Sequence, residues 1–378
     1  MAADALILGI ESSCDETAAA VVERGMVVRS SVVASQNEIH TKYGGVVPEL
    51  ASRAHMERML PVIRRAIDDA GVRLDQIDAI AVGHRPGLIG SLLIGVAAAK
   101  ALAWSLGKPL VGVDHVQAHL YAGMLAEATD RANNEATQVN SEAAALFPAL
   151  FPALGLVVSG GHTSIYLLRS WLELERLGAT IDDALGEAYD KVATILGVPF
   201  PGGPNLDRLA QSPGANDRIE DLPISRLTPT SLDFSFSGLK TAMLYQVRGV
   251  PEHPAHRRAD SRYVPPPPLT DERRRDLAAT FQRAAVRTVT LKLERTLDQL
   301  RQRGVHPKSL LTGGGVTANS RLRSELSVFA QSQRLALALP RMAYCVDNAA
   351  MLAGLASHYL NAGRTNDLSL EPVPTTAC

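Results

Sequence analysis

Cysteine and aromatic side chains are both scarce in this sequence. The three cysteines, Cys14, Cys345 and Cys378, lie far apart and have no pair spacing that suggests a disulfide framework. Their small number indicates a reducing compartment. Aromatic residues make up only 4% of the chain. Ala, Val, Leu and Ile must therefore supply the core, which favours helices packed on a mostly buried sheet.

The chain also has no excess of either charge. Its formal net charge is −1, whereas a protein that binds nucleic acid unaided usually carries a basic excess. Any contact with RNA therefore requires a local patch or the surface of a partner. Arginines do cluster between Arg257 and Arg303, but the ordinary explanation of such a cluster is a solvated helix face.

Segments that would direct the chain to a membrane are missing as well. The N-terminal stretch MAADALILGIESS has no basic region, and its apolar run is too short for a secretory signal peptide. No stretch reaches the roughly 18 uninterrupted apolar residues of a membrane span. We expect a cytoplasmic protein with no membrane partner.

Strands and helices alternate along the chain, as in an α/β protein. Strands are predicted at residues 6–12, 18–23, 27–35, 79–83 and 109–114, and helices at about 49–70, from 91 to 107 and from 115. The segments LGLVVSGGHTSIYLL and SLLTGGGVTANSRLRSELSVFA later give strands around glycine turns, followed by a helix. The second segment resembles AIAVGHRPGLIGSLLIGVAAAKALA in the first half, which indicates a weak internal duplication.

A length of 378 residues suits two lobes better than one core. We assign residues 1–125 to an N-terminal lobe, 126–152 to a polar connection and 153–346 to a C-terminal lobe. Residues 249–269 contain four consecutive prolines, which cannot join a helix or a central strand, and are predicted to be a surface loop. A last helix within about 347–378 is expected to pack back on the first lobe.

Two histidines in DHVQAHLYAG have the spacing of a metal site. His115 and His119 lie four positions apart, which places both imidazoles on one face of a helix. The pair alone is a weak signal, and Val116 stands where a zinc protease has glutamate. Asp347 is the best third ligand, although an aspartate at a helix start is as readily an N-cap. Two histidines and one carboxylate leave open positions and suit iron or zinc.

Three glycine-rich turns are candidates for holding a phosphate: Gly160–Gly161, Gly202–Gly203 and Gly313–Gly315. Each is expected to follow a strand, and glycine lets backbone N–H groups approach phosphate closely. Any one of them alone is more often just a tight turn. None matches the P-loop or the dinucleotide-binding pattern. Together they favour a nucleotide held between two lobes.

Four polar residues are further candidates. Asn319 follows the last glycine turn and either caps its helix or binds a ligand. Asp190 lies inside a predicted amphipathic helix, where a carboxylate has less structural reason to be. Asp15 and Glu16 follow the first strand and could hold metal-bound water or accept a proton, or simply form a polar turn.

Nine motifs in order resemble the signatures of the threonylcarbamoyltransferase family. They are GIESSCDET, GGVVPELASRAH, DHVQAH, VSGGHT, AYDKVATILG, PGGP, FSFSGLKTA, GGGVTAN and CVDNAAMLAG. They span nearly the whole chain, which makes the resemblance specific. It implies a two-lobed, actin-like and sugar-kinase-like ATPase fold, built from duplicated RNase H-like lobes around a cleft. The sequence departs from the family at His84 and Arg85, where small residues are usual before PGL.

The resemblance also implies site residues. His115, His119 and Asp347 match the family's metal ligands, for one divalent ion per chain, Fe2+ or alternatively Zn2+. The matches to its substrate-binding positions are Val157, Val158, Ser159, Gly160, Gly161, Asp190, Gly203 and Asn319.

The implied activity is transfer of a threonylcarbamoyl group from threonylcarbamoyl-AMP to N6 of the adenosine on the 3′ side of the anticodon. The tRNAs concerned read codons that begin with A. The implied partners are tRNA, a non-catalytic paralogue subunit and a small ATPase. A metabolite kinase of the same fold and a non-catalytic scaffold remain alternatives, and the HxxxH pair argues against both.

Overall fold

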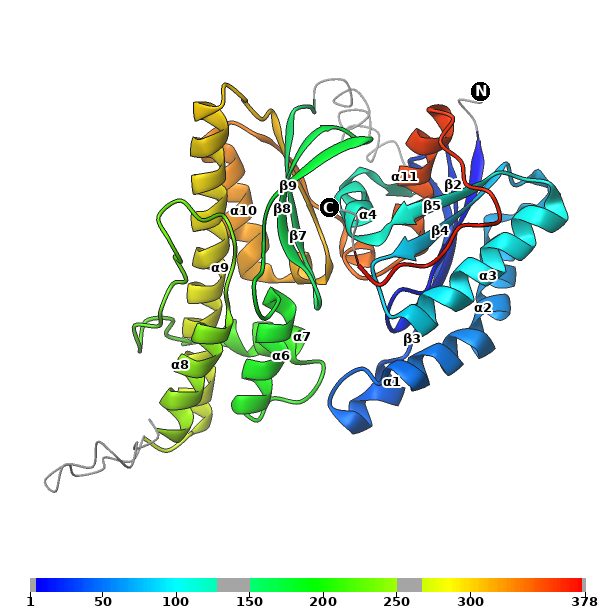
Figure 1. The fold of residues 1–378 in the computed structure, drawn as a ribbon. Coiled ribbons are helices and arrows are strands. Elements are labelled where there is room, and N and C mark those ends of the chain that lie inside the picture. Colours follow the sequence, from blue (N-terminus) through cyan, green and yellow to red (C-terminus); the bar gives the residue numbers. More distant parts are fainter. Residues whose placement is uncertain (1–4, 128–149, 250–266, 376–378) are drawn as a thin grey trace, which may run out of the picture.

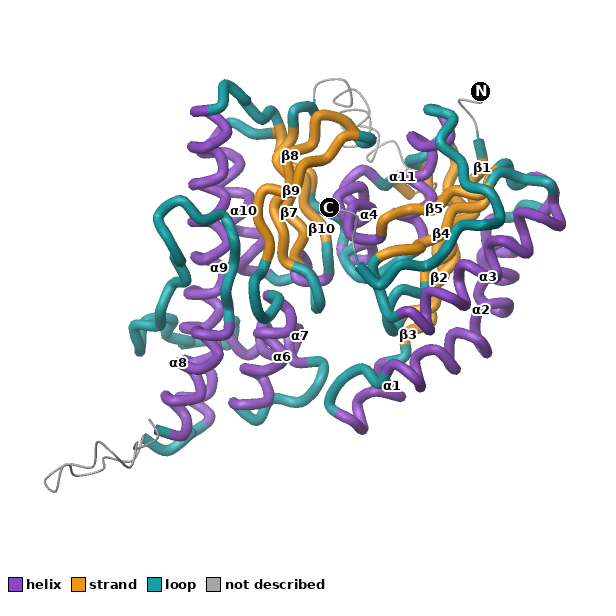
Figure 2. The backbone as a smooth tube through the Cα atoms, viewed as in Figure 1, coloured by secondary structure: helices purple, strands orange, loops and turns teal. Residues whose placement is uncertain are grey.

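The computed structural model describes residues 5–127, 150–249 and 267–375. These residues form two lobes side by side, each with its own sheet flanked by helices (Figures 1 and 2). The predicted two-lobed α/β architecture is confirmed. Most of the connection and most of the proline-rich loop expected at 126–152 and 249–269 lie outside the described residues.

The N-terminal sheet has strand order β5-β4-β1-β2-β3-β6. Its strands are β1 (Leu6–Glu11), β2 (Glu16–Glu23), β3 (Val27–Ser35), β4 (Ala79–Arg85), β5 (Leu110–Asp114) and β6 (Ala126–Glu127). Alternate side chains of β1 enter different clusters: Ile7 packs in one, and Leu8 and Ile10 in the other. Both faces of this sheet are therefore buried, as its long apolar runs require.

Helices cover both faces of this sheet. They are α1 (Asn37–His40), α2 (Pro48–Ala70), α3 (Ile89–Leu106), α4 (His115–Tyr121) and α11 (Ala349–Asn361), with short 3-10 turns η1 (Thr41–Tyr43), η2 (Leu74–Gln76) and η3 (Ala122–Met124). Helices α2 and α3 pack on one face and α11 on the other. The last helix, α11, packs on the first lobe and ends at Asn361.

The C-terminal sheet repeats the same plan, with order β11-β10-β7-β8-β9. Its strands are β7 (Ala153–Val158), β8 (Thr163–Ser170), β9 (Glu173–Ala179), β10 (Ser309–Gly313) and β11 (Ala336–Ala338). In each lobe the first strand pairs antiparallel with the second and parallel with the fourth. The duplication inferred from two short segments is therefore confirmed in strand order and direction.

The helices of the second lobe complete the fold. They are α6 (Leu185–Ile195), α7 (Gly202–Ala210), α8 (Ser237–Arg248), α9 (Asp271–Gln302) and α10 (Ser320–Gln333), with 3-10 turns η7 (Gly315–Ala318) and η8 (Met342–Tyr344). Two local expectations were wrong. Gly202 and Gly203 begin α7 instead of following a strand. The strand that was expected to end at Gly83 continues as β4 through His84 and Arg85, because Arg85 pairs with Asp114 of β5.

One described helix, α3, is long and apolar enough to cross a membrane. It packs against β4 and α2, with a third of its residues buried. The sequence had suggested no such segment, because Lys100 interrupts the apolar run. The packing is that of a helix covering a sheet, so its composition alone does not indicate a membrane protein.

Candidate active site

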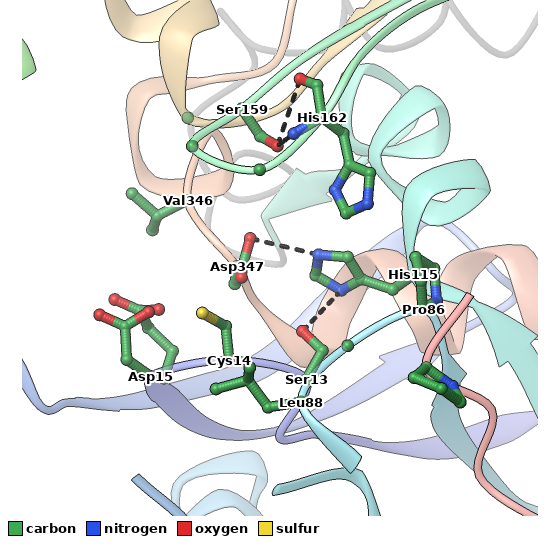
Figure 3. Close-up of a pocket in the computed structure, with 16 residues that line it drawn as sticks. Ser13, Cys14, Asp15, Pro86, Leu88, His115, Ser159, His162, Val346 and Asp347 are labelled. Carbon is green, nitrogen blue, oxygen red and sulfur yellow. Dashed lines mark hydrogen bonds and ion pairs between the residues drawn. The ribbon is translucent and has the colours of Figure 1, made fainter. Parts of the chain in front are cut away.

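A cavity of about 360 Å3 lies between the two lobes. The N-terminal lobe contributes the β1–β2 turn, the loop after β4 and the start of α4; the C-terminal lobe contributes the β7–β8 turn and η7. The loop before α11 and Pro374 complete the lining. Figure 3 shows Ser159 and His162 above the cavity, with Asp15, Cys14 and Ser13 below and Asp347 between them.

His115, His119 and Asp347 come together at this cavity. The Nε2 atoms of the two histidines lie 3.2 Å apart, and the Asp347 Oδ1 atom lies 3.4 Å from His115 Nε2 and 3.2 Å from His119 Nε2. Ligands bound to one ion at about 2.1 Å lie roughly 3 Å from one another. Two imidazoles and a carboxylate in this arrangement fit a divalent transition metal.

Local structure explains how the two histidines face one way. The side chain of Asp114 accepts hydrogen bonds from the backbone N–H groups of Val116 and Gln117, so α4 starts at His115. From that start, His115 and His119 project from one face of the helix. Both histidines are buried, with 5% and 0% of their surface exposed.

Asp347 is not the N-cap of α11. That position belongs to Asn348, whose side-chain oxygen accepts the Met351 N–H at 3.0 Å. Asp347 lies one residue earlier, and its Oδ1 atom faces the two histidines. The capping explanation that the sequence left open for Asp347 is therefore wrong.

Glu11, which the sequence analysis did not single out, orients His115. Its Oε2 atom lies 2.7 Å from His115 Nδ1, so the ring donates there and keeps Nε2 toward Asp347. Burial opposes a charge on His115, but Glu11 and Asp347 outweigh it and raise the pKa of the ring well above its usual value. The sequence did contain a signal for Glu11, because a carboxylate at the end of an apolar strand, in the same motif as Asp15, is unusual.

The pKa values of His119 and Asp347 are both lowered, but for different reasons. Burial lowers the pKa of His119, which keeps this imidazole neutral as a metal ligand must be. For Asp347 burial is outweighed by the two histidines, and the pKa lies well below its ordinary value. The Nδ1 atom of His119 has no hydrogen-bond partner among the described residues.

Asp15 and Glu16 also line the cavity, on the β1–β2 turn and the first residue of β2. Burial, with Asp347 and Asp15 nearby, raises the pKa of Glu16 to about 10. Glu16 therefore holds a proton at neutral pH in the metal-free protein.

A buried histidine that the sequence analysis missed holds this turn. His55, on α2, lies with Nε2 2.9 Å from the Cys14 carbonyl oxygen and Nδ1 2.8 Å from Thr17 Oγ1. Because a carbonyl only accepts, Nε2 carries the hydrogen, and Thr17 donates to Nδ1. Burial lowers the pKa of His55, so the neutral ring is maintained. Its helical position in the SRAH motif gave no sign of this contact.

The opposite wall comes from the β7–β8 turn. Ser159, Gly160 and Gly161 line the cavity, whereas the side chains of Val157 and Val158 are fully buried in the core. A side chain added at Gly160 or Gly161 would meet no protein atom within 4 Å. Protein packing therefore does not require glycine at these two positions, which leaves the backbone open to a ligand.

In the third glycine turn, Gly313–Gly315, packing against other parts of the protein does require glycine at two positions. A Cβ at Gly313 would lie 2.0 Å from the His119 carbonyl oxygen, and Gly314 has a φ of +95° and would meet the Val158 carbonyl oxygen. Only Gly315 lines the cavity. Gly313 and Gly314 thus let the C-terminal lobe approach α4, the helix of His115 and His119.

Asp190, Gly203 and Asn319 do not line this cavity. Asp190 Oδ1 accepts a hydrogen bond from the Gly203 N–H at 3.0 Å and so gives a partner to a backbone donor in the first turn of α7. Burial raises the pKa of Asp190. Asn319 caps α10 by accepting the Leu322 N–H at 2.9 Å. Its side chain is buried and lies beside the Tyr189 hydroxyl.

Residues 27–354 match the family described as tRNA N6-adenosine threonylcarbamoyltransferase. The chain belongs to this family. A relative so named from Symbiobacterium thermophilum is 46% identical over 372 residues, covering 98% of this chain and 96% of the relative. Another from Bacillus cereus is 42% identical over 375 residues, covering 99% and 97%. The family expected from the nine motifs is confirmed, and with it an enzyme that forms N6-threonylcarbamoyladenosine on tRNA.

Solved structures support the fold alone. HypF from T. kodakarensis superposes with a TM-score of 0.56 at 15% identity, covering 95% of this chain and 48% of HypF. A full-length HypF in the phosphate- and nucleotide-bound form gives 0.56 at 12% identity, covering 96% and 47%. This chain therefore spans about half the length of HypF, and the actin-like, duplicated architecture is confirmed.

The described arginines of α9 do not form a free basic surface. Arg287 pairs with Glu294, Arg303 beyond the helix end pairs with Glu175, and Arg295 donates to the Arg226 and Thr228 carbonyl oxygens. This arrangement agrees with the solvated helix face that the sequence suggested, and it adds internal pairing. Arg257, Arg258 and Arg262 lie outside the described residues.

Proposed function

We propose that the donor is threonylcarbamoyl-AMP and the acceptor is the adenosine on the 3′ side of the anticodon, in tRNAs that read codons beginning with A. The observation that carries this proposal is one cavity lined by His115 and Asp347, with the buried His119 completing their cluster, and by the open Gly160–Gly161 backbone on the opposite lobe. Such a cavity can hold a group rich in oxygen atoms beside a phosphate.

The reaction would need no covalent enzyme intermediate. The N6 amine attacks the carbamoyl carbon of the mixed anhydride, the new C–N bond forms, the bond to the phosphate oxygen breaks, and AMP leaves with the electron pair. The backbone of Gly160 and Gly161 would bind the phosphate, with Asn319, Asp190 and Gly203 as more distant candidates for the nucleotide. The proton lost from N6 would pass to Asp15 or Glu16, which line the same cavity.

His115, His119 and Asp347 would hold one divalent ion, which we propose to be Fe2+, with Zn2+ as the alternative. When bound, such an ion supplies Lewis-acid polarisation of substrate oxygen atoms. Glu11 would fix the ring of His115 for this purpose. The neutral His119 ring and the charged Asp347 carboxylate have the protonation states that binding requires, whereas His115, whose pKa is raised, would release its Nε2 proton when the ion binds.

We further propose that the chain works in the cytoplasm with a non-catalytic paralogue subunit and a small ATPase. The support is an exposed apolar surface on α2 and α3. Met56 and Leu60 are 64% and 69% exposed on α2, and Ile89, Leu93 and Trp104 are 48%, 50% and 75% exposed along one face of α3. Exposed apolar residues gathered in this way mark a protein interface, and the paralogue is the partner we assign to it.

The proposed chemistry is tested with the purified chain, its two partners, tRNA transcripts and threonylcarbamoyl-AMP. Mass spectrometry of the digested tRNA should show N6-threonylcarbamoyladenosine only at the adenosine 3′ of the anticodon, with AMP released in equal amount. Elemental analysis should find about one transition-metal ion per chain, and the double variant His115→Ala/His119→Ala should lose it. Modification without AMP release would rule out this donor, and equal metal content in both proteins would rule out the ligands.

A further inference from the structure

The chain beyond α11 returns to the cavity. In Figure 1 the described part of the segment after α11 runs back over the N-terminal lobe toward the other lobe. Its last described part reaches the cavity, where Pro374 lines the wall together with Pro86 and Leu88. The proposed mechanism uses none of these three side chains.

Two anchors hold the segment along the edge strand β5. The Asn366 N–H donates to the Leu110 carbonyl oxygen at 2.8 Å, and Asn366 Oδ1 accepts the Gly112 N–H at 2.8 Å. Leu370 is then 8% exposed and packs in the cluster beneath α2 and α3. A Cβ at Gly112 would lie 2.9 Å from the Leu370 side chain, so the strand leaves room for this anchor.

A third anchor, His84, lies next to the cavity. Its backbone carbonyl oxygen accepts the Val373 N–H at 2.8 Å, and its Nδ1 atom lies 3.2 Å from the Glu371 carbonyl oxygen. Because a carbonyl only accepts, Nδ1 carries the hydrogen. His84 is 9% exposed. The two bonds hold the residues on either side of Pro372 and so fix where Pro374 lies.

The three side chains that form this wall, Pro86, Leu88 and Pro374, are apolar. Pro86 and Pro374 have no backbone N–H, and the Leu88 N–H is used by the Ser13 carbonyl oxygen at 2.8 Å. A flat, weakly polar group fits such a surface better than a phosphate or a carboxylate does. Each substrate of the proposed reaction carries one such group, an adenine ring.

We propose that residues 371–374, positioned by His84, form a wall of the substrate cavity that packs against an adenine ring. This inference rests on the proposed function, because that function names the two substrates that carry an adenine ring. They are the AMP part of the donor and the target adenosine. The segment thereby sets the affinity for one of them. His84 is a positioning residue, because it acts through Glu371 and Val373.

The test compares a chain that ends at Glu371 with a control chain that ends at Thr375 and keeps Pro374. Asn366 and Leu370 remain in both. The shorter chain should raise the KM of one substrate about tenfold, the loss expected for a well-packed apolar contact. Its kcat and metal content should match the control. A raised KM for threonylcarbamoyl-AMP assigns the ring to the donor, and a raised KM for tRNA assigns it to the target adenosine.

Two substitutions keep the proposal testable if the shorter chain does not fold. His84→Ala removes the bond to Glu371 and should raise the same KM, whereas His84→Asn keeps a donor near the Nδ1 position and should restore it. Unchanged KM values for both substrates in the folded shorter chain, or in His84→Ala, would overturn the inference. If wild type gives no transfer, the proposed function fails. Calorimetric binding of AMP and of an anticodon stem-loop RNA to the same variants then tests the wall separately.

Discussion

At the scale of single residues, Asp347 and Asn348 have separate tasks although they are neighbours. Asn348 caps α11 and also donates its amide to the Val346 carbonyl oxygen at 2.8 Å. The Asp347 carboxylate instead faces the Nε2 atoms of His115 and His119. A substitution at one position should therefore alter metal binding, and at the other position helix stability.

Asp347→Asn should give a folded protein that has lost its metal. The change is nearly isosteric, so packing is preserved, but the anionic oxygen is removed. We expect a melting temperature close to that of the metal-free wild type and transfer reduced at least about tenfold, or ~1.4 kcal/mol in barrier. Elemental analysis, thermal unfolding and the transfer assay check the three parts.

The matched control is Asn348→Ala, which should cost about 1 kcal/mol of stability through loss of the cap while the metal stays bound. Near-normal transfer by Asp347→Asn at saturating donor would remove this residue from the site. The sequence could not separate the two roles, because Asp and Asn both cap helices well. Only the direction of the Asp347 carboxylate, set by the packing of α11 on the sheet, decides between them.

At the scale of elements, the approach of α11 to β1 positions Asp347. Gly9, in the middle of β1, makes that approach possible: a Cβ there would lie 2.2 Å from the Ala349 carbonyl oxygen. Gly9→Ala should therefore push the start of α11 away from the sheet. Overpacking of this kind costs about 1–3 kcal/mol, and metal affinity should fall as well, because Ala349 follows Asp347 by two residues.

The control is Gly238→Ala on α8, where an added Cβ meets no atom within 4 Å. Alanine is the better helix former, so this variant should be slightly more stable than wild type, by about 0.5–1 kcal/mol. Chemical denaturation measures both stabilities, and metal titration measures the affinity. Unchanged metal affinity in a destabilised Gly9→Ala protein would separate β1 packing from the site.

The same elements show how far sequence reasoning extends. The periodicity of apolar residues predicted α2 to within one residue of its start. The helix begins at Pro48 and ends before Gly71, two residue types that are common at these positions. It could not rank the glycine turns. Gly160 and Gly161 are open to the cavity, whereas Gly313 is required by contact with His119, far away in the chain. Such a distinction depends on tertiary contacts that no local pattern contains.

At the scale of the whole molecule, an aromatic cluster joins the two lobes. Tyr121 on α4 contacts Trp171 of the C-terminal lobe and His358 of α11, with ring centroids 4.8 and 5.4 Å apart. Burial lowers the pKa of His358 to about 4 from 6.5. The unfolded chain therefore takes up this proton first as the pH falls.

Stability from His358 should be fully present above pH 6.5 and should decrease as the pH falls toward 4. His358→Gln removes the titration and should flatten this part of the profile of unfolding free energy against pH. Denaturant titrations of both proteins at matched ionic strength give the two profiles. Parallel profiles between pH 6.5 and 4 would show that His358 does not carry this dependence.

The final prediction concerns binding partners, and it follows from charge and exposed surface together. With a net charge of −1 and the described α9 arginines paired, the chain alone should bind tRNA weakly at physiological salt. Addition of the paralogue should strengthen binding, and the apolar surface of α2 and α3 should mediate it. Leu60→Asp/Leu93→Asp should abolish both the complex and the gain in tRNA affinity. Analytical ultracentrifugation and filter binding at two salt concentrations provide the measurements.

The control variant is Val328→Asp, which changes a residue that is 62% exposed on α10 of the other lobe. This variant should bind the paralogue normally. Tight binding of tRNA by the chain alone would contradict the interpretation of the Arg257–Arg303 region as an ordinary solvated helix face. Normal complex formation by the double variant would place the paralogue on another surface.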